Sequence, residues 1–267
     1  TQLQNISPGS LAIVGVPYDE QSTFLTGCAQ APELIIEAYH SPSSNYFTEL
    51  GYDLKDDMAI SFLGNLPISE YFDIEKGIAE VLRAGGRTFS IGGDHSITYP
   101  IMKAQAQKYD KLCILQLDAH GDLYQDFEGN PYSHACPFAR IMEDGLVDRL
   151  VQVGNRTLSK HQREQAKRFG VEIIEMKDWK PGQELGLSGP LYISLDLDVL
   201  DPAFAPGISH YEPGGMSPRD VISIIHQIDV PIVGADIVEY NPFRDVADIT
   251  AALAAKMLKE IAGKMLQ

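Results

Sequence analysis

The chain has 267 residues and 44% apolar content, so we expect one hydrophobic core and a single domain over residues 1–267. The 37 acidic and 21 basic residues give a formal net charge of −16, which argues against nucleic acid and anionic membranes as partners and favours cations, although it also serves solubility. The apolar runs are too short to span a bilayer and Thr1 to Gly9 lacks the features of a secretory signal, so we expect a cytoplasmic protein.

Apolar runs alternate with helix-like segments along the chain. The predicted strands are Leu11–Val16, Thr88–Ile91, Leu112–Leu117, Leu150–Val153, Val171–Ile174, Leu191–Leu195 and Pro231–Val233. The predicted helices are Ile74–Arg83, Ile97–Gln107, His161–Phe169, Pro218–Ile228 and Ile249–Met265. We expect Ser217 to cap the helix that starts at Pro218, and Ser96 to begin another helix. Strands that alternate with helices and are apolar on both faces indicate an α/β fold with three α/β/α layers and a mostly parallel sheet.

Three short motifs place carboxylates and imidazoles directly after predicted strands. They are Gly92-Gly93-Asp94-His95-Ser96, Asp118-Ala119-His120-Gly121-Asp122 and Ser194-Leu195-Asp196-Leu197-Asp198. In an extended segment, side chains two and four residues apart point to one face, so each motif aims its polar groups at one point. In open α/β sheets, sites form in the loops beyond the carboxyl ends of the strands. We therefore expect one cluster that contains His95, Asp118, His120, Asp122, Asp196 and Asp198.

The four aspartates of this cluster would be costly to bury unless cations balance them. Two divalent ions would balance the four carboxylates, because neutral imidazoles add no charge. Carboxylate-rich ligation with some imidazole and no thiolate suits Mn²⁺ better than structural zinc. An isolated Asp-x-His is commonly a turn or a surface pair, and a Gly-Gly pair is commonly only a tight turn. The three motifs together, each after a buried strand, predict a dinuclear metal site.

Other polar residues have competing interpretations. The cysteines are odd in number and form no C-x-x-C pair, so we expect free thiols rather than a disulfide framework or a zinc site. These cysteines are Cys28, Cys113 and Cys136. His210 lies in a loop near glycines, where it either lines an entrance or is a solvated loop histidine. Asp94 fits a supporting or capping role.

With these motifs, the chain resembles the ureohydrolase family of arginases and agmatinases over nearly its whole length. The closest likeness is to plant-type arginases, in the stretches Phe127-Glu128-Gly129-Asn130-Pro131-Tyr132-Ser133-His134, Asp201-Pro202-Ala203-Phe204-Ala205-Pro206-Gly207 and Ser209-His210-Tyr211-Glu212-Pro213-Gly214-Gly215. Upstream, Ser22-Thr23-Phe24-Leu25 resembles the same group less specifically. The resemblance implies an arginase/deacetylase-like fold and two Mn²⁺ per subunit, with a bridging hydroxide as nucleophile. It implies one ion held by His95, Asp118, Asp122 and Asp196, and a second held by Asp118, His120, Asp196 and Asp198.

The resemblance also implies catalytic roles for three residues. His134 is similar in position to the proton-shuttle histidine of the family, and an imidazole titrates in the useful range. Asp122 would help to accept the proton of the hydroxide while it remains a ligand. Glu239 resembles the guanidinium-binding glutamate, since a carboxylate accepts paired N–H donors from a planar guanidinium. The alternative for Glu239 is an exposed loop charge, which is common for a single glutamate.

The implied activity is that of a dinuclear manganese guanidino hydrolase acting on a small cationic guanidino substrate. Arginase is favoured, with L-arginine and water converted to L-ornithine and urea. Agmatinase, which converts agmatine to putrescine and urea, is the alternative because Tyr124 follows the middle motif as it does in agmatinases, and other guanidino compounds stay open. From other classes, a one-zinc deacetylase-like amidohydrolase, a metallophosphoesterase and a non-catalytic metal-binding scaffold are also considered. The family further implies a homotrimer or a homohexamer.

Overall fold

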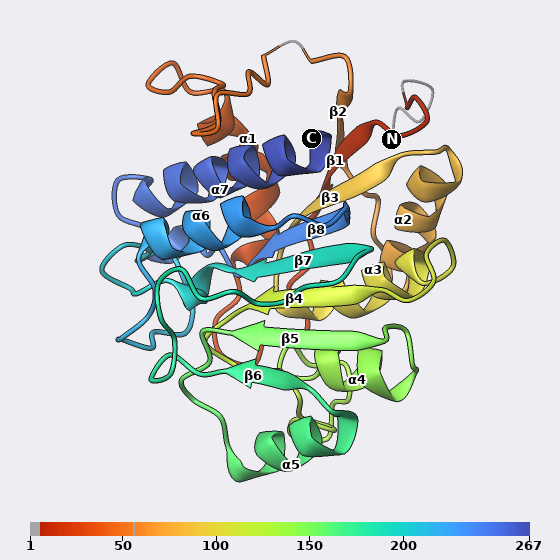
Figure 1. Ribbon diagram of the computed structural model, residues 1–267, viewed down its shortest axis with the longest axis vertical. Coiled ribbons are helices and arrows are strands. Elements are labelled where there is room, and N and C mark those ends of the chain that lie inside the picture. The colour runs from red at the N-terminus through yellow and green to blue at the C-terminus, as the bar shows by residue number, and fades with distance from the viewer. Residues whose placement is uncertain (1–5, 56) are drawn as a thin grey trace.

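A parallel sheet runs through the computed structural model, which describes residues 6–55 and 57–267. Of the segment considered above for a secretory signal, residues 1–5 lie outside the described residues. Within the described ranges the sheet has eight strands, and Figure 1 shows them stacked from β2 at one edge to β6 at the other. In spatial order they are β2 (Ile60–Asn65), β1 (Leu11–Val16), β3 (Arg87–Gly92), β8 (Ile232–Val238), β7 (Leu191–Asp196), β4 (Cys113–Leu117), β5 (Arg149–Val153) and β6 (Glu172–Ile174).

Helices cover both faces of the sheet and form two large core clusters with it, beside a small third one of Ala12, Leu63 and Val81. The helices are α1 (Ala31–Tyr39), α2 (Asp73–Arg83), α3 (Thr98–Gln105), α4 (Pro137–Glu143), α5 (Lys160–Phe169), α6 (Pro218–Gln227) and α7 (Ile249–Leu266). One core cluster joins α1, α6 and α7 to the sheet, and the other joins α2, α3, α4 and α5 to it. Neighbouring residues of one strand, such as Ile114 and Leu115, belong to different clusters because side chains alternate between the faces. The predicted three-layer α/β/α fold is confirmed.

The predicted strands correspond to seven of the strands, but three elements were missed. The missed elements are β2, α1 and α4. Strand β2 is mostly half-exposed at the sheet edge and lacks a clear apolar pattern. Strand β8 was predicted to end at Val233, which is wrong, because the strand continues through Gly234 and the buried Asp236 to Val238. A glycine and a carboxylate interrupt the apolar run there, although the backbone stays extended.

Two predictions about where helices begin can be compared with the structure. Ser217 caps α6 as predicted, and its hydroxyl accepts a hydrogen bond from the backbone N–H of Asp220. The prediction that Ser96 begins a helix is wrong by two residues, because Asp94 is the N-cap of the short 3-10 helix His95–Ile97 that leads into α3. No helix in the part of the chain that the structure describes is long and apolar enough to cross a membrane.

Candidate metal centre

The strand order brings together four chain segments that are far apart in sequence. Strands β3, β8, β7 and β4 are consecutive neighbours at the centre of the sheet. His95 follows β3, Glu239 follows β8, Asp196 ends β7 and Asp118 follows β4. Because all four strands are parallel, these residues meet at the carboxyl edge of the sheet, where sites of α/β folds form.

Asp94 and Asp196 have extended backbone, but the second and third motifs do not stay extended throughout, so the prediction that an extended backbone aims all their side chains is wrong. Strand β4 ends at Leu117, and Asp122 adopts a positive φ of 47° in the loop that follows. Asp198 lies in a 3-10 helix, Leu197–Val199. Short turns aim the carboxylates instead: one oxygen of Asp118 accepts from the backbone N–H of His120 at 2.6 Å, and one oxygen of Asp196 accepts from that of Asp198 at 2.8 Å.

One glycine of the first motif allows a close approach of the chain. A Cβ atom added at Gly93 would lie 1.8 Å from the carbonyl oxygen of Tyr18, so only glycine fits there. The carbonyl of Gly93 in turn accepts a hydrogen bond from the backbone N–H of Glu239 at 2.9 Å. This contact holds the loop after β8 beside the loop that carries His95.

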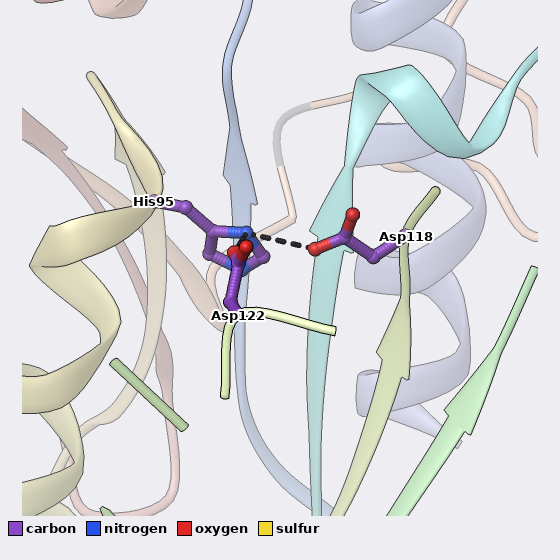
Figure 2. A group of neighbouring side chains, drawn as sticks. All are labelled: His95, Asp118 and Asp122. Carbon is purple, nitrogen blue, oxygen red and sulfur yellow. Dashed lines mark ion pairs between the residues drawn. The ribbon is translucent and has the colours of Figure 1, made fainter. Parts of the chain in front are cut away.

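The imidazole of His95 faces three carboxylates with one nitrogen. Its Nδ1 lies 3.1 Å from Asp118 Oδ2, 3.0 Å from Asp122 Oδ2 and 3.1 Å from Asp196 Oδ2. Figure 2 shows His95, Asp118 and Asp122 pointing toward one another. Although these distances are short, Nδ1 is buried and forms no well-directed hydrogen bond within the described residues. One N–H cannot serve three carboxylates, whereas a cation among these four groups would satisfy all of them.

A second group lies beside the first and shares a carboxylate with it. His120 Nδ1 lies 2.8 Å from Asp198 Oδ2 and 3.6 Å from Asp118 Oδ1. Asp118 thus turns Oδ2 toward His95 and Oδ1 toward His120. His95, Asp118 and Asp122 form one set with the spacing of metal ligands, and Asp118, His120 and Asp198 form another. The donor set therefore fits two neighbouring cations that share one carboxylate.

The electrostatics of the cluster show why a cation fits. Burial, with the charge of Asp118, raises the pKa of Asp122 to about 6. Burial, with the charges of Asp198 and Asp118, raises the pKa of Asp196 well above its usual value. Burial lowers the pKa of His95, but its contacts with Asp118, Asp122 and Asp196 outweigh this and raise the pKa well above the ordinary range. The carboxylates around His95 therefore favour a positive charge at this point, which a divalent cation would supply.

A cavity of about 200 Å³ opens onto the cluster and contains the two remaining predicted site residues. His134 and Glu239 are both buried, and His134 Nδ1 lies 2.9 Å from Glu239 Oε1. Glu239 Oε1 also accepts from the backbone N–H of His95 at 2.8 Å, whereas Oε2 has one weak contact, with the Cys28 thiol at 3.8 Å. The cavity is lined by Thr23, His120, Asp122, Tyr124, Phe127, His134, Ala135, Gln162, Asp196, Asp198, His210 and Glu239.

The buried side chains of His134 and Glu239 shift each other's pKa in opposite directions. Burial lowers the pKa of His134, but the charge of Glu239 outweighs it and raises the pKa to about 9. Burial raises the pKa of Glu239, but His134 outweighs it and lowers the pKa to about 2. His134 Nε2 faces the hydroxyl of Thr23 at 2.8 Å and the backbone N–H of Thr23 at 3.2 Å. The hydroxyl can donate or accept, so it remains a partner of Nε2 in either protonation state, whereas the backbone N–H can donate only to unprotonated Nε2.

For some residues of the cavity, the sequence left two interpretations or gave no prediction of their contacts. His210 is a partly exposed loop residue that lines the cavity, with its ring centroid 5.4 Å from that of His134 and 5.9 Å from that of His120. The contact of Thr23 with His134 was missed, and only the likeness of the stretch around Thr23 to plant-type arginases drew attention to it. The three cysteines are free thiols, as predicted.

Comparison with known proteins agrees with the geometry. The arginase family profile matches residues 9–263. Arginase 2, chloroplastic/mitochondrial, of Arabidopsis thaliana is 46% identical, covering 95% of this chain and 80% of the relative. An agmatinase of Bacillus anthracis is 32% identical, covering 94% of this chain and 90% of the relative. The structure of an arginase from Medicago truncatula has a TM-score of 0.90 at 42% identity, covering 96% of this chain and 87% of that chain. The higher identity to arginases favours arginase over agmatinase, and the chain belongs to the arginase family.

Proposed function

We propose that this protein is a dinuclear manganese arginase, which hydrolyses L-arginine to L-ornithine and urea. The observation that carries the proposal is the carboxylate of Asp118, whose two oxygens face the imidazoles of His95 and His120 separately. A carboxylate shared in this way suits two cations rather than the single zinc of a deacetylase-like enzyme. One ion would be held by His95, Asp118, Asp122 and Asp196, and the other by Asp118, His120, Asp196 and Asp198.

Glu239 would bind the guanidinium group of the substrate. Its Oε1 already accepts from the His95 backbone and lies against His134, whereas Oε2 has only the weak thiol contact. Glu239 lines the cavity, and the acceptor capacity that Oε2 keeps among the described residues would be available to the N–H groups of a planar guanidinium. Binding there fixes the guanidinium carbon near the metal cluster, which lowers the entropic cost of attack.

His134 and Asp122 would handle protons during the reaction. The leaving amine of ornithine must gain a proton, and the raised pKa of His134, about 9, leaves its imidazole able to carry one at neutral pH. Asp122 lines the cavity and lies on the cluster side of it, where a carboxylate can accept the proton that the attacking water gives up. Bound divalent cations would supply the remaining requirement, a water activated for attack near neutral pH.

Urea release in the presence of Mn²⁺ tests the proposal. We expect the wild-type protein to release urea from L-arginine and to bind two Mn²⁺ per chain. We expect His120→Asn to lose most of this activity because it removes one of the two imidazoles. If the protein retains two metal ions but releases urea from no guanidino compound, the proposed substrate class is wrong. A stoichiometry of one metal with amide hydrolysis would instead favour the deacetylase-like alternative.

Agmatine is the second candidate substrate, for a specific reason. Among the described residues that line the cavity, none is a lysine or an arginine. An α-carboxylate of arginine would therefore depend on the imidazoles and on neutral donors such as Tyr124 and Gln162, whereas agmatine has no carboxylate to satisfy. Equal concentrations of arginine and agmatine in the same urea assay distinguish the two. A higher kcat/KM for agmatine would replace arginase by agmatinase.

The remaining properties are also proposals. We propose that residues 1–267 form one domain and that the protein assembles as a homotrimer or homohexamer, which light scattering in solution would distinguish. Cytoplasmic localisation stays a prediction, because the names of the Arabidopsis relatives refer to mitochondria and chloroplasts. Microscopy of the tagged full-length protein would test it.

A further inference from the structure

A row of buried polar side chains crosses the sheet beneath the metal cluster. The row consists of Ser90 on β3, Asp236 on β8, Ser194 on β7, Gln116 on β4 and Gln152 on β5. Consecutive members are paired in register across the strands, and all five are fully buried. Two members reach the metal-ligand layer directly: Ser194 contacts His95, and Gln116 donates to Asp118. A polar row in a sheet that is otherwise apolar at its centre requires a reason, because burying these groups is costly.

The hydrogen bonds around Asp236 have a defined direction. Its Oδ1 accepts from the hydroxyl of Ser194 at 2.7 Å, and its Oδ2 accepts from the hydroxyls of Thr98 and Tyr192, each at 2.9 Å. Three donors on one carboxylate match its ionised form, which accepts only. A protonated Asp236 would leave the three hydroxyls competing for one fewer acceptor site.

This direction determines which group donates in the hydrogen bond between Ser194 and His95. Ser194 Oγ lies 2.9 Å from His95 Nε2, and its single proton is already used on Asp236. Ser194 must therefore accept a hydrogen bond from Nε2–H. In the neutral imidazole the other nitrogen, Nδ1, then carries a lone pair, and this lone pair points at the carboxylates of Asp118, Asp122 and Asp196. That tautomer and orientation are the ones that a metal-binding imidazole needs.

We propose that Asp236 is a positioning residue that fixes the tautomer and orientation of His95 through Ser194, and so sets the affinity of the cation site that contains His95. Asp236 is fully buried and is not among the residues that line the cavity, so it acts only through other side chains. The inference rests on the metal centre of the proposed function. It goes beyond that function because it assigns a role to a carboxylate outside the predicted ligand set.

Stepwise titration of the metal-free full-length protein with Mn²⁺ tests the inference. We expect Ser194→Ala and Asp236→Asn to weaken one of the two binding steps by about 10- to 100-fold, as for other supporting partners of metal ligands, and to leave the second step unchanged. We also expect excess Mn²⁺ to restore urea release in both variants. Combined in one chain, the two substitutions should weaken that step no more than Ser194→Ala alone, because Asp236 acts through Ser194.

Ser90→Ala is the matched control. Ser90 lies in the same row, pairs with Asp236 and is fully buried, but its hydroxyl has no hydrogen-bond partner in the described structure. We expect this variant to bind both ions as the wild type does. If Asp236→Asn does not fold, Tyr192→Phe, which removes one donor from Asp236, carries the same test with a smaller expected loss.

The possible results separate the inference from the proposed function. Equal weakening of both binding steps, additive effects of the two substitutions, or unchanged affinity in Ser194→Ala would each overturn the role of Asp236. A wild-type protein that binds no pair of Mn²⁺ ions would instead overturn the metal centre itself. A loss in Ser90→Ala as large as that in Ser194→Ala would show that the row matters only for packing.

Discussion

Replacing Glu239 by glutamine separates substrate binding from metal binding. The carbonyl oxygen of glutamine can still accept from the backbone N–H of His95 and face His134, as Oε1 of Glu239 does at 2.8 and 2.9 Å. The amide NH₂ would replace Oε2, which has only a weak thiol contact and is the oxygen available to a guanidinium. The substitution therefore removes one charged acceptor, together with the charge that raises the pKa of His134, and leaves the contacts of the cluster in place.

The expected magnitude follows from this loss. A hydrogen bond to a charged partner contributes about 1.5–3 kcal/mol, so kcat/KM for arginine should fall by roughly 10- to 150-fold in Glu239→Gln. The bound Mn²⁺ should remain at two per chain. Urea release at varied arginine concentration gives kcat/KM, and elemental analysis of the dialysed protein gives the metal content. Glu184→Gln, at an exposed position that does not line the cavity, is the matched control and should behave as the wild type.

Two results would refute the reasoning about Glu239. Loss of metal in Glu239→Gln would mean that this carboxylate supports the cluster rather than the substrate. A kcat/KM within about twofold of the wild-type value would mean that the guanidinium binds elsewhere, because that change is well below the free energy of one charged hydrogen bond.

The other predictions concern metal dependence and stability. Chelation of the protein should abolish urea release, and added Mn²⁺ should restore it; activity that persists after complete metal removal would contradict the metal centre. Phe138→Ala removes a fully buried ring that packs against the His95 ring, so the free energy of unfolding, measured by urea denaturation, should fall by about 3–5 kcal/mol. A decrease below about 1 kcal/mol would show that the core closes around the gap. Ser217→Ala removes the N-cap of α6 and should lower the free energy of unfolding by about 1 kcal/mol. Ser43→Ala, in an exposed loop, is the control and should leave it unchanged. Burial raises the pKa of Glu260, but hydrogen bonds, led by the one with His226, outweigh burial and lower the pKa overall. Ionised Glu260 therefore stabilises the folded protein above about pH 4, where a free glutamate is also ionised. This stabilisation is lost as the pH falls through the lowered pKa. The stability difference between wild type and Glu260→Gln should therefore shrink below that pH, and a difference independent of pH would count against this assignment.

The candidate ligands could be identified from the sequence because their local setting is repeated. His95, Asp118 and Asp196 each follow or end a buried strand, and these strands are recognisable as short, largely apolar runs bounded by polar residues or glycine. Parallel strands place their carboxyl ends at one edge, so the convergence was predictable without the strand order. The details of each loop were not, since Asp122 reaches the cluster through a positive φ that no pattern indicates.

The elements that were missed have weak patterns for physical reasons. Strand β2 is half-exposed at the edge of the sheet, where the pairing with β1 rather than an apolar pattern holds it extended. Strand β8 contains Gly234 and Asp236, which are typical of loops, yet both lie in a central strand. Asp236 is tolerated there because three hydroxyls from neighbouring elements donate to it.

The sequence by itself determined the fold class, the motifs that carry the candidate metal ligands and the family, because these depend on residue types at short spacings along the chain. Only the tertiary structure decided which groups touch: that Asp118 lies between His95 and His120, that His210 lines the cavity, and that Asp236 reaches His95 through Ser194. These contacts depend on the lateral order and register of the strands. Side chains distant in the chain set that order by packing between the layers, so no local pattern encodes it.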